Sequence, residues 1–190
     1  ALLERTGVKI VRFSPLHDPC LPDCKMVWLG GGYPELHAAT LAGNKSMLAS
    51  LRAAHQRGVA IYAECGGLMY LGTTLEDLSG AVHTMAGLIP GHSRMGKRLT
   101  RFGYCEAVAL QSTLLADAGE TLRGHEFHYS DFFPDEPAVL ACHKTRDGAI
   151  DRTWRGGWQV GNTFASYLHV HFAQRPMMLN RWLRAGREAL

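Results

Sequence analysis

The feature that most constrains this chain is a cysteine that stands between an apolar run and a glycine pair. The run Val59–Ala63 is wholly apolar and is predicted to be a strand, and Gly66–Leu71 is predicted to be a helix. A strand that turns sharply into a helix projects the residue at the turn, and small residues follow because the backbone is crowded there. The helix N-terminus stabilises a thiolate and offers N–H groups to a developing oxyanion. A lone cysteine is otherwise a small buried residue, but this setting indicates that Cys65 is a nucleophile.

The order of the surrounding segments predicts the fold class. Short apolar runs alternate with a segment that has the spacing of one helix face, Asn44–Arg57, where Asn44 is a suitable N-cap and Gly58 a suitable stop. This alternation favours an α/β domain with a mostly parallel central sheet flanked by helices, whose active site lies beyond the carboxyl ends of the strands. The predicted strands are Val8–Phe13, Met26–Leu29, Val59–Ala63, Tyr104–Leu110, His125–Tyr129, Ala138–Cys142, Trp158–Val160 and Phe164–Leu168. A last helix begins at Pro176, with Met178, Leu179, Trp182 and Leu183 on its inner face.

Two histidines near the end of the chain can supply the base that a cysteine nucleophile needs. His169 and His171 alternate, so they share one face if they lie on a strand. A nucleophile works with a general base, which a third group orients. We predict that His169 is the base and that His171 orients it. The alternative is two polar residues at the end of a strand.

Three glycines follow the strand predicted at Met26–Leu29. Gly30, Gly31 and Gly32 allow a close approach of the backbone to another group. A phosphate cradle is the usual alternative, but the G-x-G-x-x-G spacing is absent. We expect this loop to offer a backbone N–H beside Cys65.

Other motifs suggest different chemistry but are incomplete. Gly91–Lys97 has the spacing of a Walker motif, but Arg98 replaces the hydroxyl residue that binds magnesium. The segment Arg123–Tyr129 is rich in histidine and glutamate, yet it lacks the fixed spacing of a zinc site. The pair Cys20 and Cys24 is separated by proline and reads as a loop. No metal site is therefore predicted.

Composition excludes several classes of protein. The 190 residues are 46% hydrophobic and 19% charged, an ordinary globular mixture that suits one domain spanning 1–190. The formal charge of +3 is too small to indicate nucleic-acid binding, and no stretch approaches the roughly 18 apolar residues of a membrane span. The basic run Arg94–Arg101 is either a solvated loop or a contact for an anionic substrate or partner. Five cysteines, an odd number, favour a reducing cytoplasm.

Taken together, the motifs resemble the C-terminal glutaminase domain of cobyrinic acid a,c-diamide synthases, including the hydrogenobyrinic acid branch. Six segments match in the family's order over nearly the whole chain. They are Trp28–His37, Ala63–Leu71, Gly87–Gly91, Gly103-Tyr104, Arg123–Ser130 and Ala165–Phe172.

The resemblance implies a class I, triad-type glutamine amidotransferase that forms a glutamyl thioester and releases ammonia. By position, Cys65 is then the nucleophile and His169 its histidine, with the N–H groups of Gly66 and of the Gly31-Gly32 loop as oxyanion donors. The family's class I relatives carry a glutamate two residues after the histidine, where this chain has His171, so the third triad role stays open.

The resemblance also implies partners. These are glutamine, a corrinoid polycarboxylate acceptor and an N-terminal ATP-dependent synthetase domain, which would hold the ATP and magnesium while this domain needs no cofactor. Because the chain begins with Ala1 rather than Met, we expect that domain to be missing from it. Monomer and homodimer both remain open. One alternative function is the glutaminase domain of a related synthase, for cobyric acid or for nickel-sirohydrochlorin a,c-diamide. Another is a non-catalytic module that docks a partner. A cysteine hydrolase that acts on another substrate would share the Cys65 site.

Overall fold

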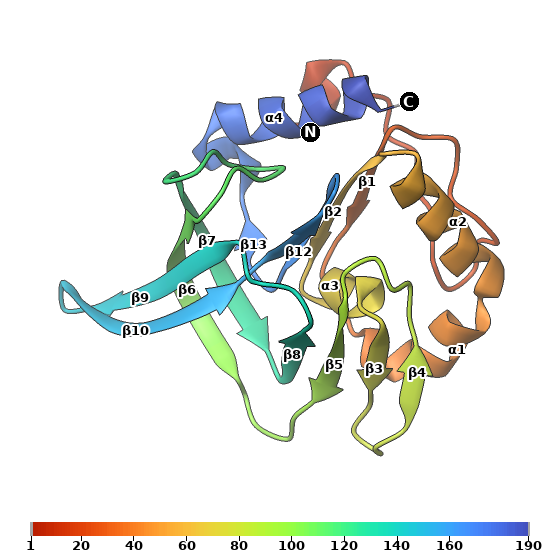
Figure 1. Ribbon diagram of the computed structural model, residues 1–190, viewed down its shortest axis with the longest axis horizontal. Coiled ribbons are helices and arrows are strands. Elements are labelled where there is room, and N and C mark those ends of the chain that lie inside the picture. The colour runs from red at the N-terminus through yellow and green to blue at the C-terminus, as the bar shows by residue number, and fades with distance from the viewer. Residues whose placement is uncertain (1, 190) are drawn as a thin grey trace.

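The computed structural model describes residues 2–189 of the chain and contains three sheets and four α-helices (Figure 1). The α-helices are α1 (Ala38–Gly43), α2 (Lys45–Gln56), α3 (Gly66–Leu71) and α4 (Pro176–Glu188), and the short 3₁₀ helices are η1 (Glu4–Thr6), η2 (Pro34–His37) and η3 (Phe172–Gln174). The strands are β1 (Met26–Leu29), β2 (Ala60–Glu64), β3 (Thr74–Glu76), β4 (Val82–Thr84), β5 (Gly91–Met95), β6 (Arg101–Ala109), β7 (Thr121–His128), β8 (Ser130–Pro134), β9 (Leu140–Arg146), β10 (Ala149–Gly156), β11 (Trp158–Val160), β12 (Thr163–Ser166) and β13 (His169–Val170).

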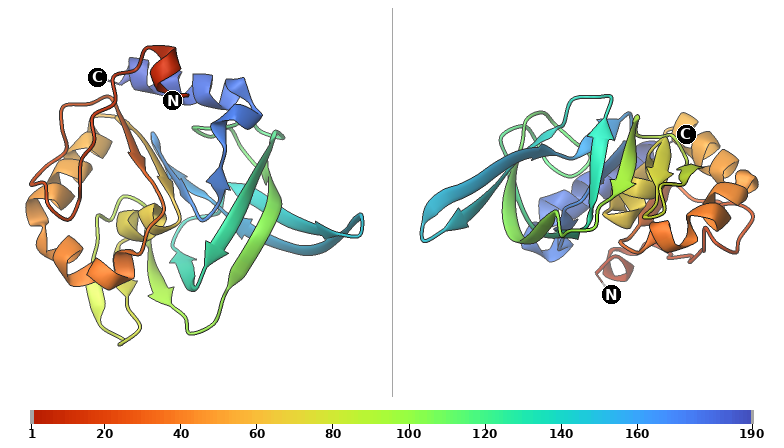
Figure 2. Two further views of the ribbon diagram at one scale, coloured as in Figure 1. Left: turned by 180° about the vertical axis from the view of Figure 1, so that it is seen from behind. Right: turned by 90° about the horizontal axis from the view of Figure 1, so that it is seen from below.

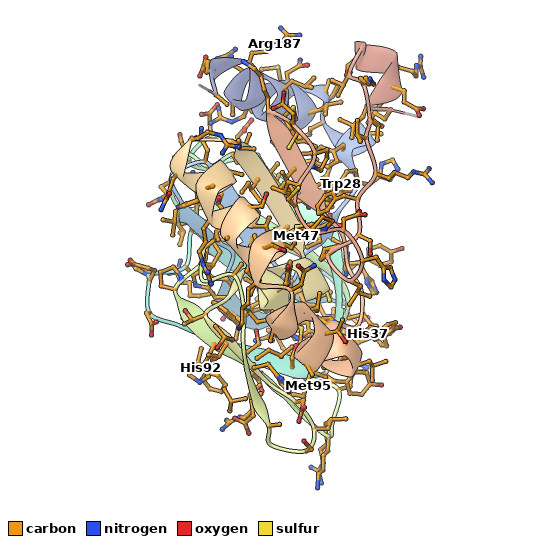
Figure 3. All side chains as sticks on the ribbon, turned by 90° about the vertical axis from the view of Figure 1, so that its right-hand side faces the viewer. Trp28, His37, Met47, His92, Met95 and Arg187 are labelled. Atoms are coloured by element: carbon orange, nitrogen blue, oxygen red, sulfur yellow. The ribbon has the colours of Figure 1, made fainter. Side chains whose placement is uncertain are left out.

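The central sheet has the order β1-β2-β12-β11 and is parallel except for β11. Every residue of β2 is buried, as its wholly apolar start predicts for a strand covered on both faces. Successive side chains of β2 therefore enter two different cores. Ile61 packs with the α2 residue Met47, while Tyr62 packs with the α4 residue Trp182. Figure 3 looks onto the α1 and α2 side, where Met47 is labelled.

The middle of the chain forms two further sheets, which are mainly antiparallel. One has the order β10-β9-β6-β7-β13 and the other β4-β3-β5-β8. The β9–β10 hairpin extends away from the rest of the molecule as a long arm (Figure 2). Strand β13 follows β12 of the central sheet but pairs with β7 of the first of these two sheets, with His169 opposite His125. This short strand therefore connects that sheet to the central sheet.

Most of the predicted elements are confirmed. The helix predicted at residues 44–57 is α2, whose N-cap Asn44 accepts a hydrogen bond from the Met47 N–H at 3.2 Å, and Gly58 follows it with φ 78°. The predicted α3, β1 and β11 also occur, and α4 begins at Pro176 with its four predicted inner residues buried. The mostly parallel central sheet is present but small, because more strands lie in the two other sheets.

One predicted strand is wrong. Residues 8–13 adopt no regular structure, and Ile10 and Val11 are exposed. A high β-propensity reports how well a residue fits a pleated, half-buried surface, and it does not form a strand where no neighbouring strand pairs with it. No helix in residues 2–189 is long and apolar enough to cross a membrane.

Candidate active site

Cys65 lies at a sharp turn between the buried strand β2 and the helix α3. Its backbone has φ 48° and ψ −104°, and its N–H donates to the Ser166 carbonyl of β12 at 2.8 Å. A non-glycine residue with positive φ is strained and costs of order 1–3 kcal/mol, so the surrounding structure must hold it in place. This is the predicted turn with the thiol at its apex.

The glycines after Cys65 are required by close packing. A Cβ on Gly67 would lie 2.6 Å from the Leu29 carbonyl oxygen, and a Cβ on Gly66 would lie 2.8 Å from the Gly32 carbonyl oxygen and 2.9 Å from the Gly32 nitrogen. The end of β1 and the loop after it therefore press directly against the turn. This contact brings together the Gly32 peptide and the Gly66 peptide, two of the groups predicted to form the oxyanion site.

His169 reaches the same place from β13. A Cβ on Gly31 would lie 2.7 Å from the His169 Cε1 atom and 3.7 Å from the Cys65 Cβ atom. A hydrogen bond with Cys65, and next a hydrogen bond with Glu64, raise the pKa of His169 to about 10. The structure thus assembles Cys65, His169, Gly31, Gly32 and Gly66 in one site.

Glu64 is the group that contacts the far side of the His169 ring. Its Oε2 atom lies 3.4 Å from His169 Nδ1, and its Oε1 atom accepts the Val170 N–H at 3.1 Å. The Tyr62 hydroxyl also donates to Oε1. Burial, followed by the adjacent Glu64 charge, raises the pKa of Tyr62 well above its usual value. Tyr62 therefore stays a neutral donor, and Glu64 is held by three hydrogen-bonding groups.

His171 does not occupy the position predicted for it. Strand β13 ends at Val170, so His171 leaves the face that His169 lies on. Its side chain is exposed and its Nδ1 atom accepts the Ala173 N–H at 3.3 Å, which caps η3. The prediction that His171 orients His169 is corrected by this geometry, because Glu64 makes that contact. The sequence did carry a signal for this role of Glu64, since a carboxylate at the end of an otherwise apolar buried strand needs a partner.

The remaining wall of the site comes from β7. The Cys65 thiol lies 3.8 Å from the Phe127 carbonyl oxygen, to which it donates. The cross-strand pairs Tyr104–His125 and His125–His169 put three rings in one row on one face of the sheet. Tyr104 is 81% exposed, so the site opens onto an aromatic surface that solvent reaches.

The other face of β7 carries a buried polar network rather than a metal site. His128 stacks on Tyr167, its Nδ1 atom lies 2.8 Å from the Ser130 carbonyl oxygen, and the Ser130 hydroxyl is 2.8 Å from the Tyr167 hydroxyl. Among residues 2–189, no group of three His, Cys, Asp or Glu side chains converges as metal ligands would. The Walker-like segment forms strand β5 and so has no phosphate-binding loop.

The class of protein follows from this site and from the sequence family. Residues 1–177 match the CobB/CobQ-like glutamine amidotransferase domain, and the chain belongs to this family.

Two curated relatives have the same, more specific name. The chain is 74% identical over its whole length to the cobyrinate a,c-diamide synthase of Salmonella typhimurium, and 49% identical over 98% of its length to that of Listeria innocua. In each comparison it spans 41% of the relative, so it covers about two fifths of the length of these proteins.

Solved structures support the fold alone. A crystal structure of a glutamine amidotransferase has a TM-score of 0.58 at 16% identity and covers 97% of this chain and 90% of its own. The PurLQS structure from Thermotoga maritima has the same TM-score at 18% identity, covering 89% of this chain and 82% of its own.

Proposed function

We propose that this chain is the glutamine-hydrolysing part of a cobyrinate a,c-diamide synthase, with Cys65 as nucleophile and His169 as its acid and base. The observation that carries the proposal is that His169 and Cys65 meet at Gly31 beside the strained turn after β2, with Glu64 3.4 Å from the His169 ring. The high identity to the two named relatives supports the pathway.

The proposed reaction proceeds in two halves. The Cys65 thiol gives its proton to His169, a transfer that the raised His169 pKa of about 10 favours. The sulfur attacks the carboxamide carbon of glutamine, a C–S bond forms, and the carbonyl oxygen becomes an oxyanion. The C–N bond then breaks as the oxyanion returns to a carbonyl and the His169 imidazolium gives this proton to the leaving nitrogen, so ammonia departs and a thioester remains. His169 next takes a proton from the water that attacks the thioester. It returns this proton to the Cys65 sulfur as the C–S bond breaks, so glutamate leaves and the thiol is restored.

The oxyanion donors proposed are the N–H groups of Gly66 and of the Gly31-Gly32 loop. The close contact between Gly66 and the Gly32 peptide supports this role. Loss of one such donor typically costs on the order of 10²–10³ in rate.

Glu64 takes the positioning role in place of His171. Its Oε2 atom favours the tautomer of His169 that carries a proton on Nδ1, which leaves Nε2 to face the thiol. Tyr62 and Val170 fix the carboxylate so that it cannot turn away.

The partners follow from the size of the relatives. The part of those proteins outside this match is proposed to be the ATP-dependent synthetase, which binds ATP and Mg²⁺ and activates the acceptor carboxylates for attack by ammonia. The acceptor is proposed to be the corrinoid named for the relatives. All five cysteines are free thiols, which supports a reducing compartment, and we propose the cytoplasm.

The test is glutamine hydrolysis by the purified chain, with glutamate and ammonia measured separately. We expect equal amounts of the two products, loss of activity in Cys65→Ser and in His169→Gln, and no turnover of asparagine, which is one methylene shorter. Retention of full activity in Cys65→Ser would contradict the proposal.

A further inference from the structure

A cavity of about 460 Å³ lies between β6 and the β9–β10 hairpin, and Cys65 does not line it. In Figure 1 the hairpin and β6 diverge toward their free ends. Four cations line the cleft, namely Arg101, Lys144, Arg146 and Arg152, together with the aromatic side chains of Tyr104 and Trp154. Only two carboxylates line it, so the lining carries a net charge of +2.

One wall of the cleft is fixed from behind by a buried carboxylate. Glu126 is 5% exposed, accepts the Trp154 indole N–H at 3.3 Å and lies 3.6 Å from the Arg101 Nε atom. The Arg101 guanidinium also stacks over the Trp154 ring at 4.4 Å. The ring and the cation are therefore ordered before any ligand arrives, which reduces the entropy cost of binding.

The position of a second cation depends on a glycine. Gly103 has φ 112°, and a Cβ there would lie 3.0 Å from the Lys144 ammonium nitrogen. Lys144 donates to the neighbouring Phe102 carbonyl oxygen at 3.1 Å. The bare backbone at Gly103 thus lets the ammonium lie across β6 at the mouth of the cleft.

We propose that this cleft binds an anion that carries several carboxylates on an apolar body, which deepens the proposed function because such an anion is the acceptor named there. Arginine and lysine side chains bind carboxylates and phosphates alike, and the aromatic surfaces beside them suit a ring-like apolar body. The residues that line the cleft do not form the glycine-rich loop or helix start that phosphate sites often use, which favours carboxylates.

The cleft is also close to the source of ammonia. Glu126 precedes Phe127, whose carbonyl oxygen is 3.8 Å from the Cys65 thiol. Tyr104 lines the cleft and pairs across the sheet with His125, which pairs with His169. Bound acceptor carboxylates would therefore lie across two strands from the glutaminase site.

The test is calorimetric titration of the 190-residue chain at low salt with mellitate, a flat ring that bears six carboxylates. Inorganic triphosphate is titrated in parallel as the phosphate-bearing comparison ligand. We expect saturable binding of mellitate at one site and weaker binding of triphosphate. Lys144→Gln and Arg152→Gln should each weaken mellitate binding about tenfold, the effect of losing one charged hydrogen bond. Arg187→Gln, an exposed cation on α4 (Figure 3), is the matched control and should leave binding unchanged.

Each result separates this inference from the proposed function. Cys65→Ser should abolish glutamine hydrolysis and keep mellitate binding, while Lys144→Gln should weaken mellitate binding and keep glutamine hydrolysis. Equal mellitate affinity in the wild type and both cleft variants would overturn the inference, as would an equal loss in Arg187→Gln. Triphosphate binding as tightly as mellitate, with the same dependence on Lys144, would overturn the assignment to carboxylates.

Discussion

At the residue scale, the proposed chemistry depends on the different contacts that the two Glu64 carboxylate oxygens make. Oε1 serves Tyr62 and Val170, and Oε2 is left for His169. This carboxylate directly precedes Cys65 in the sequence, whereas the resemblance pointed to the position two residues after His169, where this chain has His171. The sequence singled out Cys65 and His169, which the structure places together, but it could not show that β2 and β13 meet so that Glu64 faces the ring.

Glu64→Gln should lower kcat for glutamine hydrolysis by about 10²–10⁴-fold. A glutamine can keep one oxygen toward Tyr62 and Val170, but its amide then faces His169 Nδ1 and selects the wrong tautomer. The pKa of His169, followed by NMR titration, should fall from about 10 toward its ordinary value.

His171→Ala is the comparison for that variant. It removes an exposed cap of η3, so turnover should stay within about threefold of the wild type. A loss in His171→Ala as large as that in Glu64→Gln would give His171 a part in orienting His169 and contradict the assignment of that role to Glu64 alone.

At the scale of elements, the site is built where the loop after β1, the turn after β2 and strand β13 converge. Sequence periodicity predicted β1, β2, α2, α3 and α4 because each carries a local signal, such as the Asn44 cap or the buried face of α4. The predicted strand at residues 8–13 failed because pairing, not propensity, decides a strand. The pairing of β13 with β7 is a long-range contact that no local pattern records.

Within the glycine loop, Gly31 and Gly30 should respond differently to alanine. A Cβ on Gly31 would lie 2.7 Å from His169 Cε1, whereas nothing lies within 4 Å of a Cβ on Gly30. Gly31→Ala should therefore displace the His169 ring and lower kcat/KM at least about tenfold, since small misplacement of a catalytic group is costly. Gly30→Ala should be close to the wild type, and steady-state kinetics of both variants decide the matter. Equal activity of the two would show that the ring is not confined by this loop.

At the scale of the whole molecule, the raised pKa of His169 links the site to stability. Its pKa is about 10 in the folded chain against 6.5 as the ordinary value. The protonated ring therefore contributes stability that is fully present below about pH 6.5 and is lost as the pH rises through about 10.

The difference in the free energy of unfolding between the wild type and His169→Gln, measured with urea, should be larger near pH 6 than near pH 10.5. This difference should narrow in a Cys65→Ser background, because the hydrogen bond with Cys65 is the main cause of the raised pKa. A difference that stays constant across this pH range would show that the folded chain does not favour the protonated ring.

The most direct test of the central claim is covalent labelling by a glutamine-like diazoketone, with the modified residue located by mass spectrometry. Cys20 is the strictest competitor because it is exposed, whereas burial raises the pKa of Cys24 and raises that of Cys105 to about 12. The account predicts one label per chain, on Cys65, which disappears in Cys65→Ser and is slowed by His169→Gln. Labelling of Cys20 at an equal or greater rate would contradict it.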